Sequence, residues 1–319
     1  MLNRNHIEAK LVEVIDNNCI DREVFNYKPT DVIIEGLWVV PEKFEVLTKL
    51  HPTVKWNIRL HSDLPFLANE GIAMQWITDY VKFPSVSIST NSPRMLDELT
   101  FLLDLQNYWS DEELREKVYY TPNYYMPAIV SPADKLSIDY RDYIDVACFG
   151  AIRPLKNQLL QAIAALKFAD DLGKNLNFHV NVGRVENKGD PVLRNLIDLF
   201  DSVSAQGHTL VMHQWTTHDK FIEIVRNMDI GLQVSFTETF NIVSADLVAC
   251  GVPIVVSKEV NWAVPPHADP TDSNDIARKM KLVWEFKRWD CMNLNASANL
   301  DALKEYSRKS IKIWKKKFV

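Results

Sequence analysis

Several motifs of well-known enzyme classes are missing from this 319-residue sequence. It contains no P-loop, no G-x-S-x-G nucleophile elbow, no D-x-D pair and no Cys/His cluster with zinc-ligand spacing. These absences argue against P-loop nucleotide hydrolases, α/β-hydrolases and zinc enzymes. We therefore expect a protein that needs no metal ion.

Glycine, cysteine and long apolar runs are also scarce. None of the nine glycines precedes Gly36, so the N-terminal part has no glycine-rich loop. The four cysteines form no C-x-x-C pair, and Cys148 and Cys250 lie in apolar segments typical of buried, reduced thiols. No apolar run approaches the ~20 residues that span a bilayer, and the first ten residues lack the apolar core of a signal peptide. The sequence thus predicts a cytoplasmic protein.

The composition is that of a globular protein with a modest negative charge. Apolar residues make up 47% and charged residues 24%, and the net charge is −6. Such a charge offers no general attraction to nucleic acid or anionic membranes. The C-terminal end is a local exception, with Arg308, Lys309, Lys312, Lys315, Lys316 and Lys317. These side chains either contact phosphates or form the solvated face of a helix.

Short β-branched runs alternate with amphipathic segments along the chain. In residues 1–143 we predict strands at 9–16, 31–40, 54–61, 85–90 and 117–123, with helices at 42–50, 66–82 and 93–109. After a polar connector (131–143), residues 144–285 predict strands at 144–152, 176–183, 208–215, 229–236 and 252–257, with a helix at 157–173. For residues 286–319 we predict a helical tail, for which packing back on the first domain is one arrangement.

This alternation predicts two successive, doubly wound Rossmann-like α/β domains facing a central cleft. In such sheets ligands bind beyond the carboxyl ends of the strands, which directs attention to strand ends. The N-terminus leaves two interpretations open. Either 9–16 is the opening strand, or the first domain lacks its usual first βα unit.

The stretch "SFTETFNIVSADLVACGVPIVVS" (235–257) places two acids, Glu238 and Asp246, at a strand end and in the helix that follows. Free N–H groups at the start of a helix over 241–250 form a site for an anion such as a diphosphate. Carboxylates suit sugar hydroxyls because each oxygen accepts several hydrogen bonds. The alternative is that Glu238 caps the helix and Asp246 is a solvated side chain.

The same stretch resembles the E-x7-E segment of retaining GT-B glycosyltransferases of group 1, the family 4-like enzymes. Glu238 and Asp246 match the two acids, Phe240 the aromatic residue, and Gly251-Val252-Pro253 the turn before the next strand. Asn241 stands where the family has its second glycine, and Asp246 is one methylene shorter than the usual Glu. The resemblance implies that Asp246 binds ribose hydroxyls and Glu238 the sugar.

A second match is "FGAIRPLKNQ" (149–158), which resembles the family's G-x5-K segment. Gly150 and Lys156 keep that interval, and Arg153 is the nearby substitute for a family arginine, because Ala151 occupies its usual place. The resemblance implies that Lys156, Arg153 and the helix start at Asn241 and Ile242 hold the donor diphosphate. The alternative for the two cations is an exposed pair at a loop.

Three weaker elements complete the resemblance. His61, with Asp63 less strongly, matches a strand-end element that approaches the donor sugar in the family, although a lone histidine is more often structural. The segment 213–232 precedes the E-x7-E element, so the resemblance places the nucleobase near Trp215, which could equally belong to the core. Arg184 is a further strand-end candidate or an ordinary surface residue.

The predicted function is transfer of a sugar from a nucleotide-diphosphate sugar, such as a UDP- or GDP-sugar, to a hydroxyl acceptor with retention of configuration. Lys156, Glu238 and His61 are the predicted catalytic residues. Three alternatives remain: a phage-type enzyme acting on hydroxymethylated DNA bases, a non-catalytic GT-B module that binds a nucleotide or a protein, and a sugar epimerase. The non-catalytic alternative is suggested by the absent glycine-rich loop and by Asn241, which stands where the family has a glycine.

Overall fold

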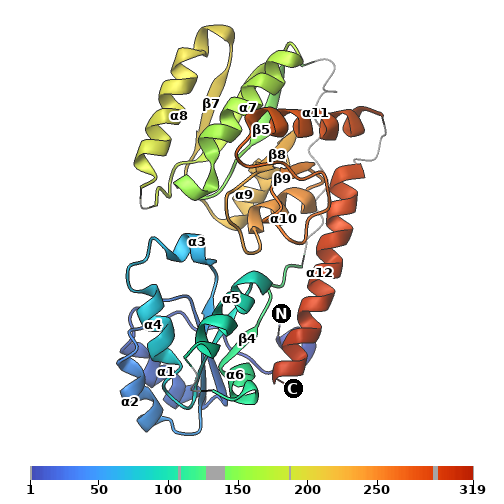
Figure 1. The fold of residues 1–319 in the computed structure, drawn as a ribbon. Helices are drawn as coiled ribbons and strands as arrows, with labels where there is room; N and C mark the ends of the chain where they lie inside the picture. Colours follow the sequence, from blue (N-terminus) through green and yellow to red (C-terminus); the bar gives the residue numbers. More distant parts are fainter. Residues whose placement is uncertain (1, 107–108, 127–140, 187, 290–293, 319) are drawn as a thin grey trace. The chain divides into compact units, whose positions relative to one another are not determined.

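The protein is described by a computed structural model, which covers residues 2–106, 109–126, 141–186, 188–289 and 294–318. The chain divides into two compact units (Figure 1). Unit 1 comprises Met1–Tyr124 and Arg308–Val319, and unit 2 comprises Tyr125–Ser307. The sequence placed the boundary later, after residue 143. Most of the predicted connector lies outside the described residues.

Unit 1 contains a four-stranded, all-parallel sheet with the order β1-β2-β3-β4. The strands are β1 (Asp31–Glu35), β2 (Lys55–Leu60), β3 (Val86–Thr90) and β4 (Val118–Tyr120). The helices are α1 (Cys19–Tyr27), α2 (Lys43–Leu50), α3 (Leu64–Leu67), α4 (Ala73–Tyr80), α5 (Pro93–Asp104) and α6 (Asp111–Lys117). Because the strands follow one another in one direction, right-handed crossovers place the connecting helices on one face.

The two faces of this sheet differ in chemistry. On one face Trp56, Ile58 and Leu60 of β2 are buried against the apolar sides of the helices, including Phe44 and Ile77. The alternate residues of β2 carry the opposite chemistry, since strand side chains point to opposite faces. Asn57 and Arg59 are buried among hydrogen bonds on the second face.

The strand predicted at 9–16 is wrong, because those residues pair with no described strand. The Asn3 side chain occupies both backbone groups of Ala9, with two hydrogen bonds of 2.8 Å. Leu11 and Ile15 are almost fully exposed. The described residues before β1 therefore add no strand to the sheet of unit 1. The helix predicted at 66–82 is interrupted near Gly71 and forms α3 and α4 instead.

Unit 2 contains a five-stranded parallel sheet with the order β7-β6-β5-β8-β9. The strands are β5 (Tyr143–Ala147), β6 (Asn175–Asn181), β7 (Thr209–His213), β8 (Ile230–Gln233) and β9 (Ile254–Val256). The helices are α7 (Gln158–Asp171), α8 (Asp190–Ser202), α9 (His218–Val225), α10 (Ile242–Ala249), α11 (Ser273–Trp289) and α12 (Leu294–Phe318). The chain runs from β5 outward to β7 and then returns to β8, so the strand order reverses between β5 and β8.

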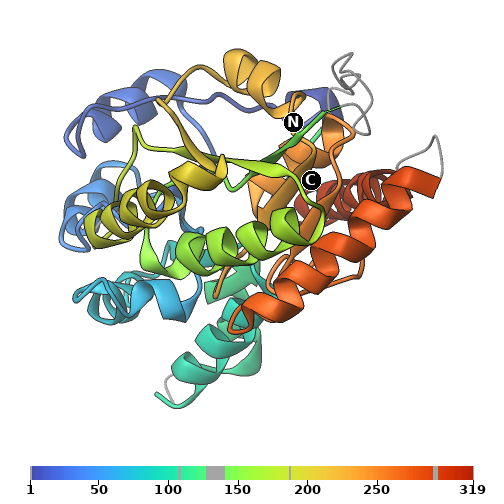
Figure 2. The same cartoon turned by 90° about the horizontal axis from the view of Figure 1, so that it is seen from above.

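Helices cover both faces of this second sheet. One core contains the side chains of α7, α8 and α11, and there α7 and α11 lie side by side (Figure 2), with Phe168 edge-on to Trp284. The other core contains the side chains of α9, α10 and the first part of α12, including Leu303. The prediction of two parallel α/β domains with a helical C-terminal tail is confirmed.

The C-terminal helix α12 contributes residues to both units, up to Ser307 in unit 2 and from Arg308 onward in unit 1. In unit 1, Trp314 is buried and donates a hydrogen bond of 2.8 Å to the carbonyl of Pro122. Within the described ranges, every helix is too short or too polar to serve as a membrane-spanning segment.

Candidate functional site

Lys156 and Glu238 meet in unit 2 at the point where the strand order reverses. Lys156 lies in the loop after β5 and Glu238 in the loop after β8. Lys156 Nζ is 2.5 Å from Glu238 Oε1, and the two side chains are only 15% and 7% exposed. Such a reversal point is where open α/β sheets bind ligands. The two segments singled out in the sequence therefore converge on the expected place.

The loop that carries Lys156 begins with a backbone turn that requires glycine. Gly150 has φ +113°, a conformation that residues with a Cβ rarely adopt, and its amide donates to Asn181 Oδ1 (3.0 Å). The loop ends in the short helix η3 (Pro154–Lys156) and in Asn157, with φ +59°. A hydrogen bond from the Phe236 amide to the Leu155 carbonyl (3.0 Å) joins this loop to the segment after β8.

Gln161 of α7 strengthens that junction, and the sequence reasoning missed it. Its amide nitrogen donates to the Lys156 carbonyl (2.8 Å), and its oxygen accepts from the Val234 amide (2.8 Å). Gln161 is buried, and a buried polar side chain with both ends paired holds its neighbours in fixed positions. A glutamine on the apolar side of a predicted helix was the available signal.

Asn241 adopts the left-handed conformation that favours glycine, with φ +58° and ψ +85°. Asparagine is among the few residues that tolerate this region. Its side-chain oxygen accepts from the Ser244 amide (2.8 Å) and so caps α10, while its nitrogen donates to Gln233 (2.9 Å). Asn241, which stands where the resembling motif has a glycine, therefore keeps the turn and adds a helix cap. Ile242, the first residue of α10, is exposed.

Asp246 is buried and already has partners within unit 2. Its Oδ1 accepts from the Tyr125 hydroxyl (2.5 Å) and lies 3.0 Å from His218 Nε2. Burial raises the pKa of Asp246, although both hydrogen bonds act in the opposite direction. The sequence reasoning did not identify Tyr125 or His218, because no local pattern links either of them to Asp246.

Arg153 and Arg184 both form ion pairs with the carboxylate of Glu186. Arg153 Nη1 is 2.8 Å from Glu186 Oε2, and Arg184 Nη2 is 2.7 Å from Glu186 Oε1. The Arg184 guanidinium also lies 5.7 Å from the ring centre of Trp215, which is more than half exposed. Trp215 is therefore not a core residue in unit 2. Lys156 and Arg153 are the two cations predicted to hold the diphosphate, and Lys156 is the one that contacts Glu238.

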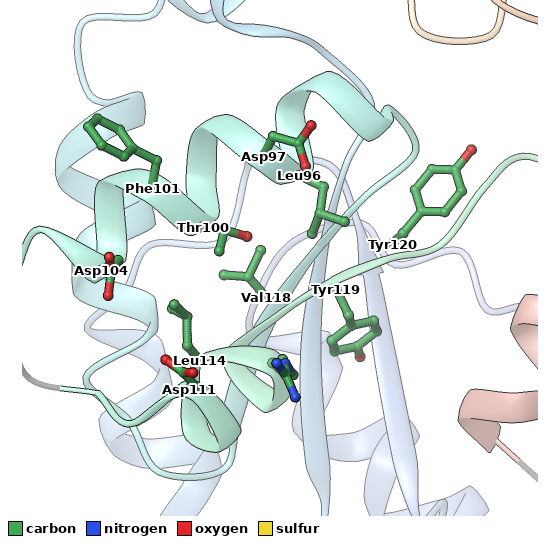
Figure 3. A pocket seen from close by; sticks show the side chains of 11 residues that line it. Leu96, Asp97, Thr100, Phe101, Asp104, Asp111, Leu114, Val118, Tyr119 and Tyr120 are labelled. Carbon is green, nitrogen blue, oxygen red and sulfur yellow. The ribbon is translucent and has the colours of Figure 1, made fainter.

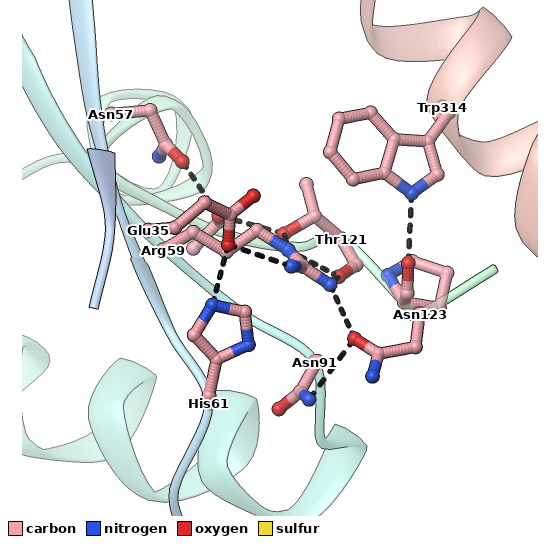
Figure 4. Close-up of polar contacts among 10 residues, drawn as sticks. Glu35, Asn57, Arg59, His61, Asn91, Thr121, Asn123 and Trp314 are labelled. Carbon is pink, nitrogen blue, oxygen red and sulfur yellow. Dashed lines mark hydrogen bonds and ion pairs between the residues drawn. The ribbon is translucent and has the colours of Figure 1, made fainter. Parts of the chain in front are cut away.

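His61 belongs to a polar network in unit 1 (Figure 4). His61 Nε2 lies against Glu35 Oε2, to which Arg59 also donates (2.9 Å). Arg59 continues the network to Thr121 and to Asn123 Oδ1 (2.6 Å). Burial opposes ionisation of Glu35, but the hydrogen bonds and charges of His61 and Arg59 outweigh it and lower the pKa of that carboxyl.

Two cavities lie in unit 1. The smaller, of about 180 Å³, lies at the carboxyl ends of β1 and β2 and is lined by Gly36, His61, Ser62 and Glu70 among others. Asp63 is buried and directed at Arg94 (2.5 Å). The larger depression, of about 670 Å³, is formed by α5, α6 and β4 (Figure 3), and no predicted site residue lines it.

The described cysteines and acidic residues do not form a further reactive or metal-binding site. Cys148 and Cys250 are buried and free, and burial raises their pKa to about 12 and about 11. In the described part of the chain, no three or more His, Cys, Asp or Glu side chains gather in a group that could hold a metal ion. The arrangement in unit 2 offers one cation, one acid and the amino end of a capped helix.

Comparisons with known proteins identify the fold. No protein-family model matches the chain. The chain is 30% identical over 168 residues to a D-inositol 3-phosphate glycosyltransferase of Stackebrandtia nassauensis, a match that covers 50% of this chain and only 36% of that protein.

Two solved structures resemble the chain over most of its length. The UDP-forming α,α-trehalose-phosphate synthase of Burkholderia xenovorans has a TM-score of 0.70 at 11% identity, covering 93% of this chain and 76% of that one. The E. coli trehalose-6-phosphate protein bound with UDP-2-fluoro glucose has a TM-score of 0.67 at 12% identity, covering 93% and 73%. The chain has the fold of a GT-B glycosyltransferase, with two parallel-sheet α/β domains.

Proposed function

We propose that the protein is a glycosyltransferase that moves a sugar from a nucleotide-diphosphate sugar to a hydroxyl acceptor, with retention of configuration. The ion pair of Lys156 and Glu238, where the strand order reverses in unit 2, is the observation that carries this proposal. A cation is needed there because departure of the nucleotide develops negative charge on the diphosphate.

In this proposal Lys156 binds the diphosphate of the donor and Glu238 binds its sugar. A bound diphosphate competes with Glu238 for the Lys156 ammonium, which frees the carboxylate to accept hydrogen bonds from sugar hydroxyls. The amino end of α10, opened by Asn241, supplies backbone N–H groups for the same anion. No carboxylate of the protein acts as a nucleophile, and the acceptor hydroxyl attacks from the face that the nucleotide leaves.

The named relatives support the class of donor and acceptor. A structure of similar fold was obtained with UDP-2-fluoro glucose, which favours a UDP-hexose donor. The relatives are named for inositol 3-phosphate and trehalose phosphate, which favours a phosphorylated polyol or sugar as acceptor.

DNA remains the alternative acceptor, because Lys312, Lys315 and Lys316 are exposed at the end of α12. Lys317 does not take part, since its ammonium lies 3.6 Å from the ring centre of Tyr119. Duplex binding that weakens steeply with salt would favour this alternative, and an absence of binding at low salt would remove it.

Thermal-shift measurements with UDP-, GDP- and ADP-glucose test the donor site. At least one of them is expected to raise the melting temperature, since a ligand that binds the folded state stabilises it by mass action. Lys156→Gln is expected to abolish the shift, and Lys156→Arg to retain part of it. Lys167→Ala is the matched control, because Lys167 is exposed on α7 and contacts Ser273 and Asn274.

Two further measurements address the reaction. Hydrolysis of the stabilising nucleotide sugar, followed by NMR, is expected to release the sugar first with the anomeric configuration of the donor. Activity is expected to persist with a chelator, because the proposal assigns charge stabilisation to Lys156. If no nucleotide sugar stabilises the protein or is hydrolysed, the proposed function is wrong.

A further inference from the structure

His218 is the exposed member of the pair that it forms with Asp246. The Asp246 side chain is only 3% exposed, whereas that of His218 is 61% exposed. His218 is the first residue of α9, and α9 follows β7 just as α10 follows β8. Both helices therefore begin at the carboxyl edge of the unit 2 sheet, the edge at which Lys156 and Glu238 meet.

Asp246 is held in its buried position from the other side by Tyr125. The Tyr125 backbone is fixed by Ser307, which accepts from its amide (3.3 Å) and donates to its carbonyl (2.6 Å). The Tyr125 ring also packs against Phe240, with ring centres 6.3 Å apart. Because the Tyr125 hydroxyl donates to Asp246 Oδ1, turning the carboxylate outward would break a short, partly buried hydrogen bond.

The pairing fixes the chemistry that His218 presents to solvent. When Nε2–H donates to the Asp246 carboxylate, the neutral imidazole carries its lone pair on Nδ1. A carboxylate behind an imidazole also makes the ring a better acceptor. The exposed part of His218 is thus suited to accept a hydrogen bond from a hydroxyl group.

We infer that His218 contacts a ribose hydroxyl of the nucleotide, and that Asp246 is the positioning residue behind it. Asp246 is one methylene shorter than the glutamate of the resembling motif, about 1.5 Å. The imidazole of His218 lies on the exposed side of this shortened acid. This inference rests on the proposed function, because it assigns the hydroxyl contact within the same donor site.

The test compares nucleotides that lack one hydroxyl. UDP and GDP, with their 2′-deoxy and 3′-deoxy forms, are titrated calorimetrically into the full-length protein. The unsubstituted protein is expected to bind a ribonucleotide about three- to tenfold more tightly than one of its deoxy forms, the effect of one hydrogen bond. His218→Ala is expected to bind all three forms with the weaker affinity.

Three further single variants and one double variant separate a contact with the nucleotide from an effect on the fold. His218→Gln is expected to recover part of the preference, because its amide donates to Asp246 and its carbonyl accepts. Lys220→Ala, an exposed substitution on the same helix, is expected to leave the preference unchanged. Asp246→Asn is expected to reduce the preference, and adding it to His218→Ala is expected to cause no further loss, as for two residues that act on one contact.

The outcomes distinguish failure of the proposed function from failure of the proposed His218 contact. If the unsubstituted protein binds neither UDP nor GDP, the proposed function fails and the inference with it. If it binds them, and His218→Ala keeps the full preference while Asp246→Asn loses it, Asp246 itself contacts the hydroxyl and the inference is overturned. If neither substitution alters the preference, the pair is structural.

Discussion

At the scale of single residues, Asn241 shows how a departure from a motif can preserve its geometry. A glycine supplies positive φ without strain, and asparagine supplies it at a small cost while capping the next helix. In this chain both functions are visible, since Asn241 has φ +58° and bonds to the Ser244 amide. The loop before α10 is therefore defined more tightly than glycine alone would define it.

Substitution of Asn241 separates these two functions. Asn241→Gly is expected to cost about 1 kcal/mol of unfolding free energy, because glycine keeps the conformation and replaces the cap at a cost of only a few tenths, but removes the hydrogen bond to the buried Gln233 oxygen. Asn241→Ala is expected to cost about 2 to 3 kcal/mol, because it loses the cap and also places a Cβ in the left-handed region. Urea denaturation measures both. Equal costs for the two variants would contradict the role of the positive φ.

The candidate site was only partly predictable from the sequence. The resemblance to two glycosyltransferase segments placed Lys156 and Glu238 in one donor site, and in the structure their side chains meet. The partners of Asp246 were not predictable, because Tyr125 lies 121 positions away along the chain and contacts it only through the fold. Arg153 was assigned to the diphosphate, and its ion pair with Glu186 was likewise not predictable from the sequence. Burial and pairing of charges are properties of tertiary structure.

At the scale of elements, β5, β6 and the edge strand β7 of unit 2 carry a chain of buried and half-buried polar groups. His179 Nε2 lies 3.1 Å from Asp145 Oδ1, and His179 Nδ1 lies 2.9 Å from His213 Nε2. At the other end Asp145 and Asp229 pair with Arg141. Burial, and then the neighbouring His179, lower the pKa of His213 below its ordinary value.

This shift predicts a loss of stability in mild acid. The unfolded chain protonates His213 near pH 6.5, whereas the folded chain does so only at lower pH, so stability falls as pH drops below 6.5. The loss is expected to be a fraction of the ~1.4 kcal/mol per pH unit that one full proton gives, because the side chain is only half-buried. Denaturation at pH 7.5, 6.5 and 5.5 measures it. His213→Gln keeps a donor for His179 and is expected to flatten the dependence; parallel curves would show that other groups are responsible.

Strands were predicted correctly where the spacing of apolar residues matches their burial in the structure. The prediction failed at 9–16, where a nearby side chain binds the backbone N–H and C=O groups. β2 and β6 were predicted because their apolar residues are regularly placed and buried in the structure. The segment 9–16 has similar residues, but Asn3 takes the backbone groups of Ala9 and the apolar side chains stay exposed. An asparagine six residues away gives no signal in a strand pattern.

At the scale of the whole molecule, the sequence predicted two parallel α/β domains and offered a tail that packs back on the first, but not that α12 divides between the two units at Ser307 and Arg308. Strand order within each sheet also depends on crossovers that no local pattern encodes. Unit 1 has connecting helices on one face only, and its second face is polar. Trp314 of α12 covers part of that face, with the Arg59 guanidinium 5.5 Å from its ring centre.

The role of α12 in unit 1 can be tested through Trp314. Trp314→Ala removes a buried ring and its hydrogen bond to Pro122, and is expected to cost about 3 kcal/mol. Hydrogen exchange followed by mass spectrometry should then show faster exchange in β2 and β4, with β5 and β6 unchanged, because Trp314 belongs to unit 1. Trp314→Phe keeps most of the buried area and is expected to give a smaller effect. Equal acceleration in the strands of both units would mean that α12 stabilises the molecule as a whole and that Trp314 does not act on unit 1 alone.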